Sequence, residues 1–131
     1  MITEAHKYNP SIPFEVGDVF NLKFLDNSVS GIVAPYLIVN FTIKETLEAF
    51  LEIYRVLKPN SYFLLSFHIG NNNKKSFMNL ITKGTKLTFT FFKVNTIKKL
   101  LKKVGFEISE VIIKEPYKGE ITTRSFIFSY K

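Results

Sequence analysis

The sequence predicts an α/β domain in which a mostly parallel sheet ends in an antiparallel hairpin. Short apolar and β-branched runs alternate along the chain with segments of helical periodicity. Residues 31–34 are apolar throughout, as is typical of a parallel strand covered on both faces. Residues 106–113 and 123–130 are joined by a loop short enough for an antiparallel pair. No repeat or linker divides residues 1–131, so one domain is expected.

Each expected strand is a short run rich in apolar, aromatic or β-branched residues and bounded by turn-forming residues. The expected strands are residues 14–16, 31–34, 61–67, 86–92, 106–113 and 123–130. Gly17 and Asp18 end the first of them, and Pro35 ends the second. Residues 70–75 have the composition of a polar loop.

Two longer helices are predicted from apolar residues that recur every three or four positions. The first begins at a capping box formed by Thr42 and Glu45 and ends at Asn60. The second is expected to be capped by Asn95 and to end at Gly105. Shorter helices are predicted over residues 2–8 and 76–82. The faces expected to be buried comprise Leu47, Phe50, Leu51, Tyr54 and Leu57 in the first helix, with Glu48 and Glu52 outside it, and Ile97, Leu100, Leu101 and Val104 in the second.

Composition excludes several classes of function. The chain has no cysteine, which excludes disulfides, thiolate nucleophiles and cysteine-based metal sites. Its longest apolar runs fall short of the roughly 20 residues that span a bilayer, and its first residues lack the apolar core of a secretion signal. A cytoplasmic domain without membrane contact is therefore expected. No phosphate-binding loop or H-E-x-x-H motif is present, and the two histidines have no spacing that indicates a metal site.

The charge is unevenly distributed along the chain. Residues 1–60 hold five Lys or Arg and seven Asp or Glu, a net charge of −2, whereas residues 61–131 hold thirteen and four, a net charge of +9. A basic half can attract acidic partners such as nucleic acid. The alternative is a lysine-rich face that is simply solvated.

Several sequence features occur in an order that resembles a known family. Gly17 and Asp18 follow a short strand, and the segment L-K-F-L-D-N-S spans residues 22–28. Then come the strand at residues 31–34, a helix that runs into E-I-Y-R-V-L-K-P at residues 52–59, and a third strand. This succession resembles the class I S-adenosylmethionine-dependent methyltransferases, in particular the small-molecule, methyltransferase type 11-like branch. The resemblance implies a Rossmann-like methyltransferase fold, a transferase activity and S-adenosylmethionine as the cofactor.

The resemblance assigns the adenine of the cofactor to the end of the first strand. It implies that the Asp18 carboxylate accepts a hydrogen bond from the exocyclic amine, and that the adjoining backbone at Val19 and Phe20 donates to a ring nitrogen. Ligands of open α/β sheets bind beyond the carboxyl ends of strands, which is where these residues are predicted. The alternative is a simple turn in which Asp18 caps a helix.

Two further strand ends are candidates for the site. The resemblance implies that Ala34, Pro35 and Tyr36 line the methionine part of the cofactor; alternatively, Pro35 only ends a strand and Tyr36 packs beside it. His68 follows a central strand and is a weak candidate for a catalytic or substrate-orienting group, although a lone histidine is more often structural. An aromatic cluster forms either a substrate lid or core: Phe89, Phe91 and Phe92.

The chain departs from the family in its first part. Family members carry a glycine-rich loop of the form E/D-x-G-x-G-x-G before the segments described, and no such motif occurs here. Smaller departures are Ser30 where the family has Asp, Asn60 and Ser61 where it has Gly-Gly, and Asn40 near a usual His. The resemblance therefore predicts a truncated domain that lacks the first two family strands and is inactive or incomplete by itself.

A sheet without those strands would leave an apolar edge and faces open, and such surfaces pair with other chains. We therefore expect self-association or a partner chain that completes the sheet. Two other functional hypotheses remain open at this point. One is a non-catalytic binding module, or partner subunit, that uses its basic C-terminal half, and the other is a gene remnant that folds without activity. The methyl acceptor is not predicted, because a fold does not determine a substrate.

Overall fold

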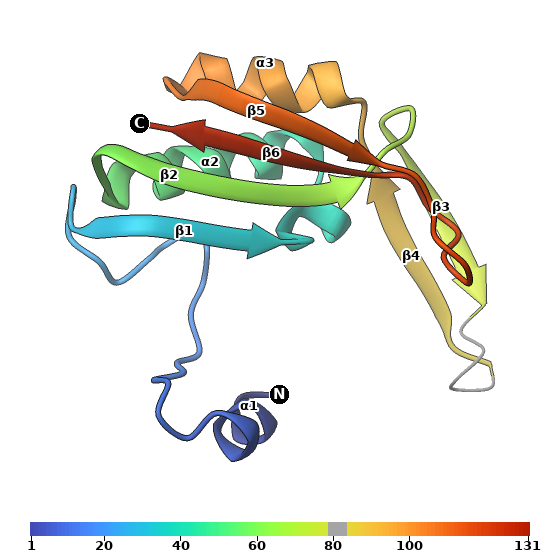
Figure 1. Cartoon of the computed structure of the whole chain (residues 1–131), viewed down its shortest axis with the longest axis horizontal. Helices are drawn as coiled ribbons and strands as arrows, with labels where there is room; N and C mark the ends of the chain where they lie inside the picture. Colours follow the sequence, from blue (N-terminus) through green and yellow to red (C-terminus); the bar gives the residue numbers. More distant parts are fainter. Residues whose placement is uncertain (79–83) are drawn as a thin grey trace.

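A four-stranded sheet forms the centre of the fold (Figure 1). The computed structural model describes residues 1–78 and 84–131. In sheet order the strands are β1 (Val29–Pro35), β2 (Leu57–His68), β6 (Arg124–Tyr130) and β5 (Glu107–Lys114). β1 and β2 are parallel, and the pairings of β2 with β6 and of β6 with β5 are antiparallel. The predicted α/β class and the C-terminal hairpin are confirmed. The described sheet is not mostly parallel, however, because β1 and β2 form its one parallel pairing and the strands of the hairpin supply the two antiparallel ones.

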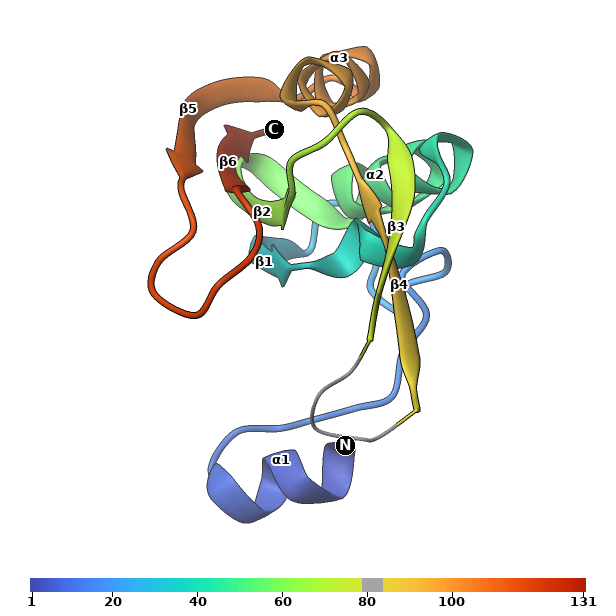
Figure 2. The same ribbon diagram turned by 90° about the vertical axis from the view of Figure 1, so that its right-hand side faces the viewer.

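Two helices, α2 (Ile43–Val56) and α3 (Val94–Val104), pack on the same face of this sheet (Figure 2). The core lies between the helices and the sheet. Phe63 of β2 is fully buried there, with its ring 5.8 Å from that of Phe50 and 5.5 Å from that of Phe106. Ile97 and Leu101 of α3 are also fully buried, as the helical periodicity predicted.

The remaining elements surround this centre. A hairpin of β3 (Asn73–Met78) and β4 (Lys86–Phe91) forms a separate two-stranded sheet. A short 3-10 helix, η1 (Leu37–Asn40), joins β1 to α2. The N-terminal helix α1 (Ile2–Tyr8) buries no residue, and both ribbon views show it apart from the sheet. Its predicted bounds are confirmed.

The start of α2 is the predicted capping box. Glu45 N–H donates to Thr42 Oγ1 at 3.1 Å, and Thr42 N–H donates to the Glu45 carboxylate at 2.9 Å. Asn60 adopts the expected left-handed conformation, with φ of 62°. However, α2 ends earlier than predicted, because residues from Leu57 onward already belong to β2.

The buried face of α2 differs from the predicted one. Its buried residues are Thr46, Ala49, Phe50, Ile53 and Val56, whereas Leu51 is half exposed. The helix carries two adjacent apolar stripes about one residue apart, and periodicity alone does not choose between them. The stripe that contains the small residues Thr46 and Ala49 faces the sheet, because small side chains allow the helix to approach the sheet closely.

Three local predictions are wrong. Residues 14–16 are not in a strand: neither edge strand of the sheet, β1 or β5, pairs with them, and the chain that follows is held against α2 at residues 22–26. Residues 73–78 form β3 rather than a loop and the start of a helix, because they pair with β4. The rest of the predicted helix, residues 79–82, lies outside the described residues. Asn95 does not cap α3; instead, the Asn72 side chain accepts from Lys93 N–H at 2.9 Å.

Gly105 ends α3 as predicted. Its φ is 125°, and its N–H donates to the carbonyls of Leu101 and Lys102 at 3.2 and 3.1 Å. A Cβ at this position would lie 2.9 Å from Tyr54 Oη. Tyr54 has no room to yield, because its ring packs at 5.0 Å against Phe106. Both the backbone conformation and the close contact therefore require glycine.

We expect Gly105→Ala to lower the free energy of unfolding by about 2 kcal/mol or more, since it combines a disfavoured φ with a steric clash. Urea denaturation measures this loss. Gly119→Ala is the matched control, because Gly119 has a φ of 89° but no atom within 4 Å of the added Cβ. Its cost is expected to be about 1 kcal/mol. Equal losses in the two variants would contradict a steric role for Tyr54.

Candidate functional site

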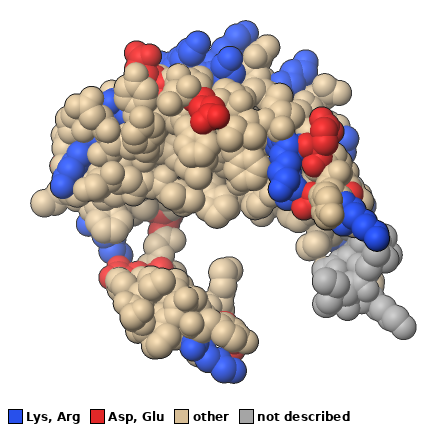
Figure 3. Space-filling model, viewed as in Figure 1, with Lys and Arg blue, Asp and Glu red and all other residues tan. Residues whose placement is uncertain are grey.

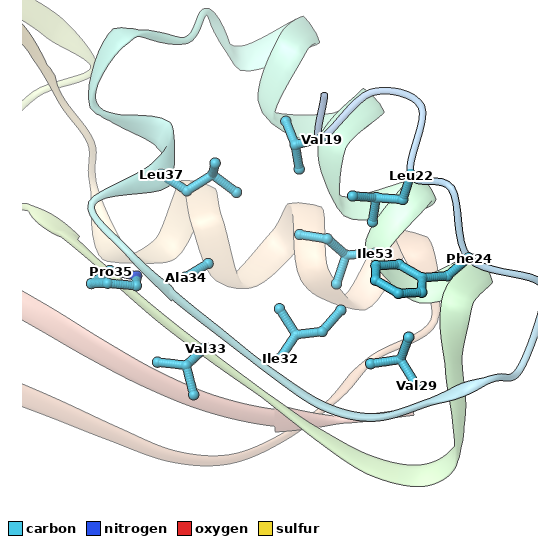
Figure 4. A pocket seen from close by; sticks show the side chains of 10 residues that line it. All are labelled: Val19, Leu22, Phe24, Val29, Ile32, Val33, Ala34, Pro35, Leu37 and Ile53. Atoms are coloured by element: carbon cyan, nitrogen blue, oxygen red, sulfur yellow. The ribbon is translucent and has the colours of Figure 1, made fainter. Parts of the chain in front are cut away.

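An apolar pocket lies beside β1, between this strand, the preceding segment and α2 (Figure 4). Its volume is about 390 Å³, which is within the range of ligand-binding pockets. Every residue that lines it has an apolar side chain: Val19, Leu22, Phe24, Val29, Ile32, Val33, Ala34, Pro35, Leu37 and Ile53. The pocket therefore offers shape and apolar contact, but no side chain that forms hydrogen bonds.

One arginine holds the outer wall of this pocket in place. Arg55, in the last turn of α2, donates to the carbonyls of Leu22 and Phe24, each at 3.0 Å. It also forms an ion pair with Asp26 at 2.7 Å and donates to the Glu52 carboxylate at 2.6 and 2.8 Å. Glu52 in turn accepts from Leu22 N–H at 2.8 Å. Residues 22–26 are thus anchored to α2 at several points, and we call this arrangement the Arg55 latch.

Electrostatics keep the latch charged. The hydrogen bond from Arg55 lowers the pKa of Glu52, against the opposing effect of partial burial. The same bond, together with that to Asp26, raises the pKa of Arg55. Both partners therefore remain ionised at neutral pH. The Glu52 side chain is only 15% exposed, so its carboxylate belongs to the fold and is not offered to a ligand.

The structure places Asp18 in a tight turn. Its carboxylate accepts from Phe20 N–H at 2.9 Å, and its carbonyl accepts from Asn21 N–H at 3.1 Å. This geometry is a turn, as in the alternative that the sequence left open, but no helix follows it for Asp18 to cap. Val19 points into the apolar pocket, whereas Phe20 packs against Phe41 with ring centroids 5.1 Å apart. Asp18 itself lines an adjoining hollow of about 640 Å³.

The three residues at the end of β1 separate in space. Ala34 and Pro35 line the apolar pocket beside Val19. Tyr36 turns away from it in a left-handed conformation, with φ of 54°. Its N–H donates to the Ser66 carbonyl of β2 at 3.0 Å. Thus Val19, Ala34 and Pro35 share one pocket, whereas Phe20 and Tyr36 do not line it.

Tyr36 instead joins an aromatic cluster around His68, at the carboxyl end of β2. The His68 ring stacks on Tyr36 at 5.0 Å and on Phe91 at 5.3 Å. His68 Nδ1 lies 3.0 Å from Thr122 Oγ1. Burial, and secondarily the positive charge of Arg124, lower the pKa of His68. The imidazole is therefore largely neutral at neutral pH, a state in which it is able to accept a proton.

Arg124 connects this cluster to the C-terminal hairpin. It pairs with His68 across β2 and β6 and donates to Tyr36 Oη at 3.4 Å. It also forms an ion pair with Glu120. A hydrogen bond from the Tyr117 backbone, and then Arg124, lower the pKa of Glu120. The end of β1, the end of β2 and the hairpin loop are thus joined at one point.

The aromatic residues that the sequence offered as a lid lie mainly in the core. Phe92 is fully buried and Phe91 is 2% exposed. Phe92 packs at 6.4 Å against Phe67 of β2. Phe89 contacts the His68 ring at 5.7 Å. Phe91 and Phe92 therefore stabilise the fold, and Phe89 extends the cluster around His68.

Sequence reasoning missed the residues that build the pocket wall. Glu52 was predicted to lie outside the buried face of its helix, and no function was predicted for Arg55. Both belong to the segment E-I-Y-R-V-L-K-P, and their targets Leu22, Phe24 and Asp26 belong to L-K-F-L-D-N-S. The sequence feature that could have indicated this contact is the presence of both segments, since each supplies one half of the Arg55 latch. Periodicity within either segment does not reveal that contact.

Two kinds of site are not found in the parts of the chain that the structure describes. Within residues 1–78 and 84–131, no three His, Cys, Asp or Glu side chains are grouped as a metal ion would require. Among the helices of the same residues, none is long and apolar enough to cross a lipid bilayer.

Comparisons with known proteins agree on one family. Residues 1–65 match the model of a methyltransferase domain. A search of curated proteins finds no match. Among solved structures, the chain is similar to an S-adenosylmethionine-dependent methyltransferase from Methanosarcina mazei, with a TM-score of 0.83 and 21% identity over 99% of this chain and 76% of that one.

Two other solved structures have the same fold. A Mesorhizobium loti S-adenosylmethionine-dependent methyltransferase has a TM-score of 0.74 and 12% identity, covering 100% of this chain and 76% of that one. The Burkholderia thailandensis 1,6-didemethyltoxoflavin-N1-methyltransferase, with bound 1,6-didemethyltoxoflavin and S-adenosylhomocysteine, has a TM-score of 0.72 and 13% identity over 98% and 55% of the two chains. At these identities the similarity establishes the fold and leaves the substrate undetermined.

We expect Arg55→Ala to release the pocket wall. Arg55 donates to two carbonyls and two carboxylates, and the loss of these bonds leaves residues 22–26 without their anchor on α2, so amide hydrogen exchange in residues 20–26 is expected to rise roughly tenfold or more. Exchange in β6 is expected to stay unchanged. Lys44→Ala is the control, because Lys44 forms only an exposed pair with Glu48 at 3.8 Å on the same helix. Unchanged exchange in residues 20–26 would show that the latch does not hold them.

We expect the free energy of unfolding to decrease as the pH is lowered, because His68 takes up a proton more readily in the unfolded chain. The folded-state pKa is lowered from 6.5, so the unfolded chain binds the proton more readily. The contribution of neutral His68 is therefore fully present above about pH 6.5 and is lost as the pH falls towards the folded-state pKa. His68→Phe, which retains a stacked ring, should flatten this part of the stability profile in urea denaturation. Parallel profiles for the original chain and His68→Phe would refute the assignment.

Proposed function

Because the chain belongs to the class I S-adenosylmethionine-dependent methyltransferase family, we propose that it supplies the adenine edge and the acceptor side of a methyltransferase site for a small molecule. We further propose that residues 1–131 by themselves bind the cofactor negligibly and are inactive. The observation that carries this proposal is the pocket beside β1, which is lined only by apolar side chains. It offers contact to a flat apolar ring but has no side chain for polar groups.

The fit of S-adenosylmethionine to these residues is partial. Adenine is a flat ring that suits the apolar wall formed by Val19, Leu22 and Ile32. In this proposal the Asp18 carboxylate, which lines the adjoining hollow, accepts a hydrogen bond from the exocyclic amine of adenine. Its present bond with Phe20 N–H uses one oxygen, and a carboxylate accepts several hydrogen bonds.

The polar half of the cofactor has no comparable set of contacts in the described residues. Ribose hydroxyls, an amino group and a carboxylate each need a polar partner when they leave water. The carboxylate nearest to the pocket on α2, that of Glu52, is already used by Arg55 and Leu22 N–H. No G-x-G sequence occurs in residues 1–131 to supply backbone amides for these groups. The residues present therefore do not fit the complete cofactor, and no reaction step is assigned through it.

On the acceptor side, the cluster of Tyr36, His68 and Phe89 adjoins the end of β1. Methyl transfer depends mainly on the positioning of donor and acceptor, so aromatic walls next to the methionine end suit an acceptor ring or chain. The neutral His68 imidazole is the candidate to take up a proton from an acceptor. In this proposal Ala34 and Pro35 lie along the methionine part of the cofactor.

A second candidate function is a non-catalytic binding module. The observation that favours it is the row of lysines on the outer side of α3 (Lys98, Lys99, Lys102 and Lys103), where Figure 3 shows Lys and Arg along the upper margin. However, an amphipathic helix normally presents charged residues to water opposite its buried face. The family membership favours the methyltransferase reading, so this candidate ranks second.

Isothermal titration of S-adenosylhomocysteine into the 131-residue chain tests the proposal. We expect no saturable binding, because the polar half of the ligand finds no partners. The same chain preceded by a glycine-rich segment of the family form E/D-x-G-x-G-x-G is expected to bind saturably. Saturable micromolar binding by residues 1–131 alone would overturn the proposed incompleteness.

The adenine contact is tested in that extended chain. Asp18→Asn keeps the turn, since the amide oxygen still accepts from Phe20 N–H, but removes the charge. We expect roughly tenfold weaker binding. Glu15→Gln, at another exposed carboxylate of the adjoining hollow, should bind as before. Equal affinities for the two variants would remove Asp18 from the site.

A further inference from the structure

Another hollow, which we call the α2 hollow, lies between the start of α2 and the hairpin of β3 and β4. Figure 1 and Figure 2 show this hairpin beyond the end of the sheet at which β1 and β2 terminate. The volume of the α2 hollow is about 380 Å³, which is within the range of ligand-binding pockets. It shares no lining residue with the pocket beside β1, and its lining includes polar side chains: Thr42, Lys44, Asn72, Lys74 and Thr90.

The hydroxyl of Thr90 has no partner. Thr90 is 7% exposed, and no atom of the described residues forms a hydrogen bond with its buried Oγ1. In the hairpin register Thr90 lies opposite Lys74, so the two side chains share one face. Phe89 and Phe91 lie on the other face, where their rings contact His68. The face with Thr90 and Lys74 is therefore turned towards α2. A buried hydroxyl without a partner is costly, and a ligand that bonds it would remove that cost.

The first turn of α2 contributes backbone donors to the same hollow. Its capping box uses the N–H groups of Thr42 and Glu45. The other two N–H groups of the first turn belong to Ile43 and Lys44, and they have no acceptor within the helix. Both of these residues line the α2 hollow. Free amides at the positive end of a helix dipole favour an anion.

Two lysines add positive charge, one on each wall of the hollow. Lys44 lies on α2, and Lys74 lies on β3. Lys44 contacts Glu48 only at 3.8 Å, and such exposed pairs are weak, so its ammonium group is free to turn towards a ligand. Neither Glu48 nor Glu45 lines the hollow, and the Glu45 carboxylate accepts from Thr42 N–H. The charge that a ligand meets in the hollow is therefore positive.

The hairpin wall is fixed by Asn72, which precedes β3. Its side chain accepts from Lys93 N–H at 2.9 Å and donates to Thr96 Oγ1 at 2.9 Å. These bonds tie the hairpin to the start of α3, which packs beside α2 on the sheet. Thr90 and Lys74 are thus held opposite the start of α2 before any ligand binds. A site that is formed in advance loses less conformational entropy on binding.

We propose that the α2 hollow binds a phosphate group, either free or as the monoester of a small molecule. Its donors are the first-turn amides of α2, the Thr90 hydroxyl and two ammonium groups, and the oxygens of a tetrahedral phosphate point in enough directions to meet them. A flat carboxylate is matched best by the planar fork of an arginine, and none is found among the described residues that line the hollow. The apolar side chains of Phe41, Ile43 and Phe92 offer contact to an organic group on the phosphate. This site is separate from the methyl-donor and acceptor sites proposed above.

Titration of phenyl phosphate and of inorganic phosphate into the ¹⁵N-labelled chain, followed by NMR, tests the proposal. We expect saturable shifts of the amide signals of Ile43, Lys44 and Thr90 with both probes. Either order of affinity supports the site: tighter binding of phenyl phosphate identifies a monoester as the ligand, and equal affinities identify free phosphate. The absence of saturable shifts with both probes overturns the proposal.

Thr90→Val removes the hydroxyl and keeps a side chain of similar shape. We expect about tenfold weaker binding of phenyl phosphate. Urea denaturation should show no loss of stability, since the hydroxyl has no partner in the free protein. Thr88→Val is the matched control, because Thr88 lies on the same face of β4 but bonds to Ser76 at 2.9 Å and does not line the hollow. Unchanged binding by Thr90→Val would refute the site.

A second pair of variants separates a local charge from the net charge. Lys74→Gln removes a lysine of the α2 hollow. Lys75→Gln removes the same charge from the other face of β3, where the Lys75 ammonium lies 4.9 Å from the centre of the Phe91 ring. We expect Lys74→Gln to weaken phosphate binding and Lys75→Gln to preserve it. Equal losses would show attraction by the net charge of +7 as a whole, and would overturn a site in this hollow.

Discussion

Burial of one side of β2 is the constraint on which the rest of the structure depends. Phe63, Leu65 and Phe67 are each 0% exposed. Phe63 packs against Phe50 of α2 and against Phe106, which follows α3, and Phe67 packs against Phe92, which precedes α3. Because side chains alternate along a strand, fixing this side fixes the opposite one as well. β1 and β6 then take their registers from β2. The positions of Ala34, at the pocket, and of His68, in the aromatic cluster, both follow from these registers.

The Arg55 latch shows how two weak sequence motifs become one structural feature. Neither segment is distinctive alone, yet one supplies Arg55 and Glu52. The other supplies the carbonyls and carboxylate to which Arg55 donates and the Leu22 N–H from which Glu52 accepts. The latch closes the outer wall of the apolar pocket without placing a free polar group inside it. The same interactions that shape the pocket thus use up the groups that a polar ligand would need.

The start of α2, the left-handed conformation of Asn60 and the end of α3 at Gly105 are predictable from the sequence. Each of them depends on residues that are close together in the chain. Predictions failed where a distant partner decided the outcome. Residues 73–78 became a strand because β4 pairs with them, and residues 14–16 did not because the latch draws the following chain towards α2. At the candidate site, the family order located Val19, Ala34 and Pro35 together. The separation of Tyr36 from them depends on its left-handed backbone and its bond to β2, which no spacing rule reveals.

The openness of the pocket follows from the position of β1. The sequence of this strand is that of a central strand, apolar over residues 31–34, yet it lies at the edge of the described sheet. Ile32, Val33 and Ala34 therefore line an open pocket, and Val33 is 70% exposed. An edge strand that carries no charged residue is poorly protected against pairing. Any segment or chain that covers β1 would therefore also change the pocket, so that a ligand bound preferentially to one state of this edge would shift the balance between the states.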